Sequence, residues 1–277
     1  NRSMYTEYQP SHLLVPYIDS YWEFKGNPDY GMRIHILPDG CTDFIFTLGE
    51  VANAVEEGSL IMQPYRSYFV GPMTKYSELV TYTESIHMFG VRFLPCGLSC
   101  FTNLPLHEFV NSRVSTNEMK AVFDDTFIEK LGEQKHVTDR IRVVEEYLLA
   151  YLARHYQPAD SHVAMAVNMI NHSKGKRSVR SLMDDVCLCQ RHFERKFKHY
   201  TGFTPKEYSR IVKFKNAVEL LRTTTSANLL TTAVDAGYYD LAHFSKEIKS
   251  MSGNTPASFL SLTVPEETTL TYIEPQR

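Results

Sequence analysis

A duplicated segment in the last third of the chain limits the folds that this sequence can adopt. The run RHFERKFKHYTGFTPKEY starts at Arg191, and a similar run, AHFSKEIKSMSGNTPASF, starts at Ala242. The two copies align at a constant offset of 51 residues, so that Gly202 pairs with Gly253. Two copies are too few for a solenoid, which stacks at least about three units. Each copy is therefore expected to be a small unit that the protein uses twice.

The composition is typical of a soluble globular protein of about two domains, because 43% of the 277 residues are hydrophobic and 22% are charged. The sequence contains neither a run of about 18 apolar residues nor an amino-terminal signal pattern. These features predict a cytoplasmic protein that does not enter a membrane. The five cysteines lack CxxC spacing, which favours reduced thiols over a zinc site or a disulfide framework. A redox role for Cys187 and Cys189 stays open as the alternative.

The charge distribution divides the chain into three parts. Residues 158–262 carry 15 Lys and Arg against 9 Asp and Glu, whereas residues 1–157 carry 13 against 20, and residues 263–277 carry 1 against 3. The segment HYQPAD at 155–160 marks the first boundary, since Pro158 ends a helical pattern where the charge balance changes sign. We therefore predict a domain over 1–157, a basic domain over 158–262 and a tail over 263–277. A basic domain favours a polyanionic partner, and a solvated charged surface is the simpler alternative.

The first hundred residues have the pattern of short β-strands. Alternating runs such as RIHIL at 33–37 and DFIFTL at 43–48 are separated by turn signals such as PDG at 38–40. Many short strands of this kind predict a β-rich barrel or sandwich. Helical patterns follow after about residue 103. The predicted fold class is therefore α+β, with an all-α second domain.

One long helix is expected at the end of the first domain, starting near Thr138. Its apolar stripe consists of Ile141, Val144, Leu148 and Tyr151. The stripe must be buried, either against its own β domain or against a second subunit in a homodimer. In the second case, charged residues at Val144 and Leu148 would give a soluble monomer.

Each copy of the duplicated unit is predicted to consist of a helix, a short turn and a second helix. In the first unit a helix from about Ser178 ends near Cys187, and a second helix runs from about Cys189 to Tyr200. Apolar residues occupy one side of each second helix, and polar or small residues occupy the other. The outward residues are Gln190, Arg191, Glu194, Arg195 and Lys198 in the first unit and Ala242, Ser245, Lys246 and Lys249 in the second. A helix of this kind, braced by a preceding helix, can enter the major groove and contact base edges.

The link between the two units is predicted to be one rigid helix. The run from Thr204 to Glu207 is a capping box with proline at the first helical position, and an apolar pattern continues to about Arg222. About 18 residues span about 27 Å, which approaches the turn of B-DNA of about 34 to 36 Å. Such a strut could place the two second helices in successive major grooves.

The residues from LMDDVCLCQRHF to GNTPASF closely resemble the double helix-turn-helix domain of AraC-type transcription regulators over about 100 residues. The resemblance implies a seven-helix domain that binds double-stranded DNA. It implies base-reading positions at Arg191, Glu194 and Arg195 in the first unit, and at Ala242, Ser245 and Lys246 in the second. The first unit departs from the family pattern, because Cys187 stands where a glycine is usual.

The amino-terminal half, with DSYWEF, LPDGCTDFIFTLG and YFVGPMT, resembles the poorly characterised sensor-type domain that precedes some AraC-type domains. This resemblance implies a regulatory domain without naming an effector. Pockets combine apolar walls with a few oriented polar groups. On that ground the candidate effector residues are Trp22, Arg33, His35, Asp43, Tyr65 and Arg92, each of which also has an ordinary structural explanation.

The leading interpretation is thus a sequence-specific, DNA-binding transcription regulator controlled by a small molecule or by dimerisation. It predicts no cofactor or metal, a homodimer, and RNA polymerase as a possible partner. One alternative keeps the DNA binding but makes the first domain purely an oligomerisation module. A metal-dependent enzyme using His12, His35, His87 or Asp43 is disfavoured, because no metal-ligand spacing or nucleophile motif groups these residues.

Overall fold

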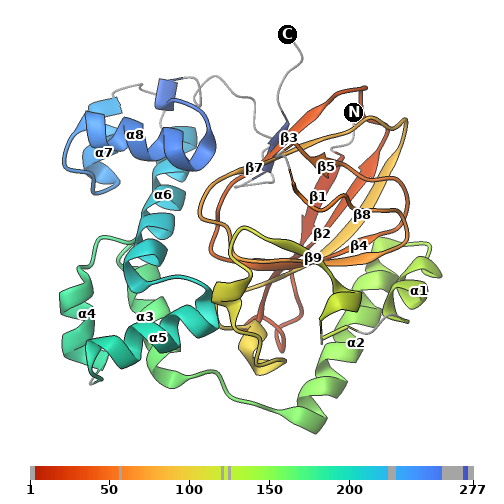
Figure 1. Cartoon of the computed structure of the whole chain (residues 1–277), viewed down its shortest axis with the longest axis horizontal. Coiled ribbons are helices and arrows are strands. Elements are labelled where there is room, and N and C mark those ends of the chain that lie inside the picture. Colours follow the sequence, from red (N-terminus) through yellow and green to blue (C-terminus); the bar gives the residue numbers. More distant parts are fainter. Residues whose placement is uncertain are drawn as a thin grey trace.

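The computed structural model describes residues 4–55, 58–119, 122–123, 126–186, 188–223, 229–257 and 271–273. Within these residues the chain forms two lobes, one built from β-strands with two helices beside them, the other built from helices α3 to α8 (Figure 1). The α+β class predicted from the sequence is confirmed. Helix α2 ends at His155 and α3 begins at Ser161, so residues 156–160 connect the lobes.

The β-rich lobe is a sandwich of two antiparallel sheets rather than a closed barrel, as far as the described strands show. The larger sheet has the order β1-β2-β8-β4-β6-β9, and the smaller has the order β10-β3-β7-β5. The larger sheet consists of β1 (Tyr5–Tyr8), β2 (Ile18–Gly26), β8 (Ile86–Phe93), β4 (Thr42–Thr47), β6 (Ser67–Val70) and β9 (Arg113–Ser115). The smaller consists of β10 (Thr271–Ile273), β3 (Arg33–Ile36), β7 (Ser77–Val80) and β5 (Asn53–Ala54).

Both faces of the larger sheet are buried, which explains its nearly continuous apolar strands. Side chains alternate between the faces along a strand, so Tyr21 and Trp22 enter different cores. Trp22 lies in the core between the sheets, and Tyr21 lies in the core under the helices. The indole of Trp22 crosses β8 at Gly90, where an added Cβ would lie 1.9 Å from its ring. Glycine at that position is what lets the indole lie flat on the sheet.

The predicted long helix is α2 (Val137–His155), which covers the outer face of the larger sheet together with α1 (Phe127–Gly132) (Figure 1). Val144 and Leu148 are fully buried in the core of this lobe, and Ile141 and Tyr151 pack against the same core. Val144 and Leu148 are thus covered within their own lobe, whereas Ile141 and Tyr151 are only partly buried. The interpretation of this stripe as a subunit interface stays a prediction.

The helical lobe has one continuous core formed by six described helices. Phe193 and Phe197 from the first unit share this core with Phe244 and Ile248 from the second. Residues 256–257 are helical as well, and the residues after 257, where the seventh helix implied by the family resemblance would continue, lie outside the described range. The helices are α3 (Ser161–His172), α4 (Val179–Val186), α5 (Gln190–Thr201), α6 (Pro205–Thr223), α7 (Leu229–Asp235) and α8 (Leu241–Ser252).

The two lobes are packed directly on each other. Leu37 and Cys96 of the β-rich lobe are buried in the core of the helical lobe. The turn at Gly40 adopts a left-handed φ of +86°, and a Cβ there would lie 2.8 Å from the ring of Tyr208 in α6. The terminal strand β10 returns to the β-rich lobe and pairs with β3. The segment that follows the helical lobe thus adds a strand to the smaller sheet.

Candidate nucleic-acid interface and ligand cavities

Helix α5 presents a polar face to solvent because its apolar face is fixed in the core. Cys189 is its N-cap, and Gly202 ends it in the left-handed conformation with a φ of +84°. The side chains of Gln190, Arg191, Arg195 and Lys198 are exposed, whereas Glu194 is half-buried. The amide of Gln190 donates a hydrogen bond to Glu194 over 2.9 Å. The outward face predicted from the sequence is thus available to a partner.

Helix α8 repeats this arrangement in the second unit. The carboxylate of Asp240 caps its start by accepting from the backbone N–H of His243 over 2.7 Å. Ala242, Lys246 and Lys249 are exposed, and Ser245 is half-buried. This face offers fewer long polar side chains than α5 does.

Helix α6 holds the two second helices in a fixed arrangement, with α5 near one of its ends and α8 near the other (Figure 1). The predicted capping box is present: the N–H of Glu207 donates to the hydroxyl of Thr204 over 3.1 Å, and the N–H of Thr204 donates to the Glu207 carboxylate over 2.7 Å. Arg210 of α6 makes two hydrogen bonds with the carboxylate of Glu247 in α8, at 2.7 and 3.0 Å. Bidentate pairs of this type give geometric specificity.

The turns of the two units differ at the position where the family favours glycine. In the second unit Gly237 has a left-handed φ of +85° between α7 and α8. Cys187, which occupies the corresponding place in the first unit, lies outside the described residues. Nearby, Asp185 pairs with Arg177, which places this acidic group beside a basic one.

Three of the six candidate effector residues meet in a buried polar cluster in the β-rich lobe. Arg92 is only 6% exposed. Its guanidinium lies 3.3 Å from the carboxylate of Asp43, 3.4 Å from that of Asp39 and 3.1 Å from that of Glu7. The indole N–H of Trp22 donates to Asp43 over 2.6 Å.

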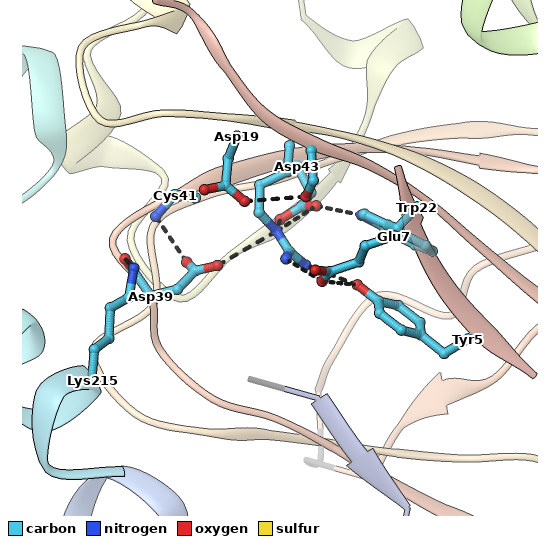
Figure 2. Close-up of polar contacts among 10 residues, drawn as sticks. Tyr5, Glu7, Asp19, Trp22, Asp39, Cys41, Asp43 and Lys215 are labelled. Carbon is cyan, nitrogen blue, oxygen red and sulfur yellow. Dashed lines mark hydrogen bonds and ion pairs between the residues drawn. The ribbon is translucent and has the colours of Figure 1, made fainter. Parts of the chain in front are cut away.

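This cluster reaches the helical lobe through Asp39. Figure 2 shows Glu7, Asp39 and Asp43 converging on one region, with Lys215 approaching Asp39 from the side of α6. The ammonium of Lys215 donates to the backbone carbonyl of Asp39 over 3.3 Å. The carboxylate of Asp39 also accepts from the backbone N–H of Cys41 over 2.8 Å, which fixes the turn.

The burial of the cluster changes the protonation of Asp43. Desolvation and, to a smaller extent, the carboxylate of Asp39 raise the pKa of Asp43 to about 6, even though Arg92 acts in the opposite direction. The surrounding carboxylates raise the pKa of Arg92, which therefore stays charged. A single cation is thus shared by three carboxylates, one of which, that of Asp43, has a pKa raised to about 6.

The cavity beside this cluster is small. Trp22, Asp43 and Arg92 line it together with apolar side chains, and its volume is about 50 Å³. Ligand pockets usually measure about 300 to 1,000 Å³. The other candidates lie elsewhere: Arg33 is a half-exposed partner of Glu78, and Tyr65 is exposed. His35 is buried and stacks on the ring of Tyr76 with ring centroids 5.9 Å apart.

A larger cleft of about 430 Å³ adjoins this cavity, and the two share Val70, Met73 and Arg113. Polar residues that were not predicted from the sequence line the cleft, among them Lys75 and Asn111. Lys75 follows β6 and Asn111 precedes β9, so the two residues are distant in the sequence and no local motif groups them. The turn signal GPM at 71–73, which begins one wall, was the only sequence pattern in this region.

Among the described residues, the metal-ligating side chains and the buried thiols of Cys41 and Cys96 do not form a metal site or a reactive-cysteine site. No group of three or more His, Cys, Asp or Glu residues could hold a metal ion there. Burial raises the pKa of the Cys96 thiol to about 12 and also raises that of Cys41, which makes both poor nucleophiles. Among the same residues, no helix has the length and apolar character to cross a bilayer.

Comparisons with known proteins agree with this architecture. Residues 182–261 match the model of a helix-turn-helix domain, and residues 6–115 match that of a domain of unknown function, DUF6597. No curated protein matches the sequence. The fold is similar to that of ToxT from Vibrio cholerae, with 9% identity and a TM-score of 0.52, over 88% of this chain and 98% of that one.

Two shorter solved structures are similar to part of this chain. The carboxy-terminal domain of AraT, a response regulator from Geobacillus stearothermophilus, is 20% identical, with 39% of this chain and 92% of that one covered and a TM-score of 0.35. The DNA-binding domain of AdpA, solved in complex with a target DNA, is 19% identical, with coverages of 37% and 92% and a TM-score of 0.34.

Proposed function

We propose that the chain is an AraC-type transcription regulator and that α5 and α8 read a specific sequence in two successive major grooves. The observation that carries the proposal is the pair of exposed polar helix faces at opposite ends of one helix. The 19 residues of α6 span about 28 Å. With its flanking turns, this length suits the spacing of about 34 to 36 Å between adjacent grooves on one side of B-DNA.

The side chains of α5 have distinct roles in this proposal. Arg191 and Arg195 are four residues apart and lie on one face, opposite Phe193 and Phe197. An arginine fork contacts O6 and N7 of guanine, so Arg195 is assigned to base reading. Lys198 lies one turn further on and is assigned to the phosphate backbone.

On α8 the exposed charges are Lys246 and Lys249, while Ala242 and Ser245 are small. This helix is assigned mainly to positioning, with Lys246 as its base-contacting residue. The weaker polar face of α8 supports unequal half-sites, in which the first unit supplies more of the discrimination.

The β-rich lobe is assigned a regulatory role, with a small-molecule effector that acts on DNA binding. The cleft of about 430 Å³ supports this role over that of a purely oligomeric module, because its size is in the range of ligand pockets. A homodimer and contact with RNA polymerase remain part of the proposal. Within the stripe from Ile141 to Tyr151, Val144 and Leu148 are buried in their own lobe, whereas Ile141 and Tyr151 are only partly buried. Analytical ultracentrifugation of the full chain measures the oligomeric state.

The full chain is expected to bind duplex DNA with an affinity that falls steeply as salt is added. Each neutralised phosphate contributes about 0.9 to the slope of log K against log salt, so six to ten contacts cost about 10³-fold to 10⁵-fold between 50 and 200 mM. Anisotropy titrations of a labelled duplex measure this slope. Lys198→Ala should reduce the slope by about one unit.

Lys196→Ala is the matched control, because the Lys196 ammonium pairs with Asp160 over 2.6 Å and is half-buried. Its slope should equal that of the unmodified protein. An affinity that does not depend on salt would contradict the proposed function.

A further inference from the structure

A short basic loop beside the first helix-turn-helix unit packs against the second unit. It comprises residues 173–176, between α3 and α4, and we call it the basic loop. A Cβ at Gly175 would lie 2.3 Å from the backbone carbonyl oxygen of Ser209 in α6. A Cβ at Gly237, in the turn before α8, would lie 3.0 Å from the side chain of Lys176. The basic loop thus touches both the connecting helix and the turn of the second unit.

Backbone hydrogen bonds fix the conformation of the basic loop. The N–H of Lys174 donates to the carbonyl of Asn171 over 2.9 Å, and the N–H of Lys176 donates to that of Ser173 over 3.0 Å. Lys174 has a left-handed φ of +52°, a conformation that glycine and asparagine adopt more readily than lysine. A lysine that is held there despite this cost indicates a requirement for its side chain.

The ammonium groups of the basic loop have no acidic partner in the part of the chain that the structure describes. Lys174 and Lys176 are exposed, and neither makes an ion pair there. The neighbouring Arg177 differs, because its guanidinium pairs with Asp185. The side chain of Lys213 in α6 lies beside the loop and adds a further positive charge. The loop therefore presents ammonium groups that a polyanion can neutralise.

The basic loop lies next to the end of α8 that is expected to enter DNA. The carboxyl ends of α5 and α8 are covered by the β-rich lobe, because a Cβ at Gly202 would lie 2.6 Å from Pro72 and one at Gly253 would lie 2.6 Å from Tyr76. Helix-turn-helix proteins contact base edges with the amino-terminal residues of the second helix. The turn at Gly237, on which the basic loop packs, leads into that end of α8.

The groove pattern of B-DNA places a minor groove opposite the basic loop. Two successive major grooves on one side of a duplex are one helical turn apart, and a minor groove bordered by phosphates passes between them. The basic loop lies between the two reading helices (Figure 1). A·T-rich tracts have a narrow minor groove, whose enhanced negative potential attracts lysine and arginine. Two unpaired ammonium groups at this position suit such a groove.

We propose that the basic loop contacts the minor groove between the two half-sites, and that Lys174 and Lys176 confer a preference for an A·T-rich spacer there. This inference rests on the proposed function and adds to it a part of the DNA that neither reading helix contacts. The preference arises from the width and potential of the groove and not from hydrogen bonds to particular bases.

The test uses three duplexes that share the half-sites selected by the full chain and differ only in the spacer. One spacer is A·T and one is G·C. The third is inosine·cytosine, which keeps the major-groove pattern of G·C but lacks the guanine amino group in the minor groove. Anisotropy titrations are expected to give an affinity at least about fivefold higher for the A·T spacer than for the G·C spacer. The inosine·cytosine duplex should bind within about twofold of the A·T duplex.

The double variant Lys174→Gly, Lys176→Ala should bind the three duplexes with affinities that differ by less than about twofold. The slope of log K against log salt should fall by about 0.9 for each lysine removed. Glycine suits the left-handed φ at residue 174, and Lys176 is exposed, so the midpoint of thermal unfolding should change little. Lys130→Ala is the matched control, because it removes an exposed ammonium group from α1, far from the helical lobe (Figure 1). It should keep both the preference and the slope.

Each opposite outcome overturns one statement. Equal affinities of the unmodified protein for the A·T and G·C spacers overturn the spacer preference. An inosine·cytosine duplex that binds as weakly as the G·C duplex overturns reading through the minor groove. A preference that persists in the double variant overturns the role of the basic loop. The proposed function fails by a different result, namely that the unmodified protein binds none of the three duplexes.

Discussion

Leu148→Asp is expected to unfold the β-rich lobe and not to produce a folded monomer. Leu148 is fully buried in the core between α2 and the larger sheet, where an aspartate would be an unpaired charge. Burying such a group and removing the apolar packing together cost more than about 4 kcal/mol. Urea denaturation followed by tryptophan fluorescence measures the loss, since Trp22 is the single tryptophan of the chain and lies in this lobe.

Ala150→Asp is the matched control, because residue 150 is exposed on the same helix and receives the same side chain. Its free energy of unfolding should change by less than about 0.5 kcal/mol. If Leu148→Asp instead gave a monomer with an unchanged midpoint, the stripe of α2 would be a subunit interface.

Arg92→Met is expected to reduce the free energy of unfolding by about 3–5 kcal/mol at pH 7. The substitution keeps much of the side-chain volume but leaves Glu7, Asp39 and Asp43 without the cation that they share. Buried charges that lose their partner are strongly destabilising, whereas surface ion pairs contribute little. Arg33→Met provides the comparison, because the ion pair of Arg33 with Glu78 lies at the surface and its loss should cost less than about 1 kcal/mol.

The loss in Arg92→Met should depend on pH in a defined direction. The pKa of Asp43 is raised in the folded protein to about 6 from 3.8. A raised pKa means that the folded state binds the proton more readily, so this group stabilises the fold below about pH 4 and ceases to do so as the pH rises through 6. Removing Arg92 raises this pKa further, and lowering the pH from 7 to 5 should restore part of the stability. A loss that is equal at both pH values would show that the carboxylates are not its cause.

The helical lobe could be predicted closely because its signals are local. Glycine at the end of a helix, a capping box and apolar residues at helical spacing act within a few residues of one another. Accordingly, the predicted helix ends lie within one residue of Gln190 and Thr201 in α5 and of Thr223 in α6. The duplication also indicated that both units have the same helix-turn-helix structure, which no pattern within a single unit could show.

The cleft of about 430 Å³ could not be predicted because its residues come together only through tertiary contacts. Val70 and Arg113 are far apart in the sequence and lie side by side because β6 pairs with β9. Arg92 and Asp43 were identified, but the structure shows that they satisfy each other in a small cavity. An arginine beside an aspartate in neighbouring strands has the same sequence pattern whether the pair binds a ligand or stabilises the fold.

The packing between the lobes could not be predicted from the sequence either. Leu37 and Cys96 looked like ordinary residues of the β-rich domain, yet they complete the core of the helical lobe. Gly40 was recognised only as part of a turn, and its close approach to Tyr208 depends on how the lobes dock. Contacts between the two lobes produce no periodic pattern in the sequence, because the residues that meet belong to different lobes.

The central claim is that α5 and α8 read DNA together, and binding selection from randomised duplexes with the full chain tests it most directly. The account predicts two half-sites whose centres are about 10 to 10.5 base pairs apart. Arg195→Ala should relax the preference at one or two base pairs of one half-site only, with a loss of about 1–3 kcal/mol of discrimination. Lys198→Ala should leave the preferred sequence unchanged while lowering affinity evenly. A single half-site, or an unchanged preference after Arg195→Ala, would contradict the account.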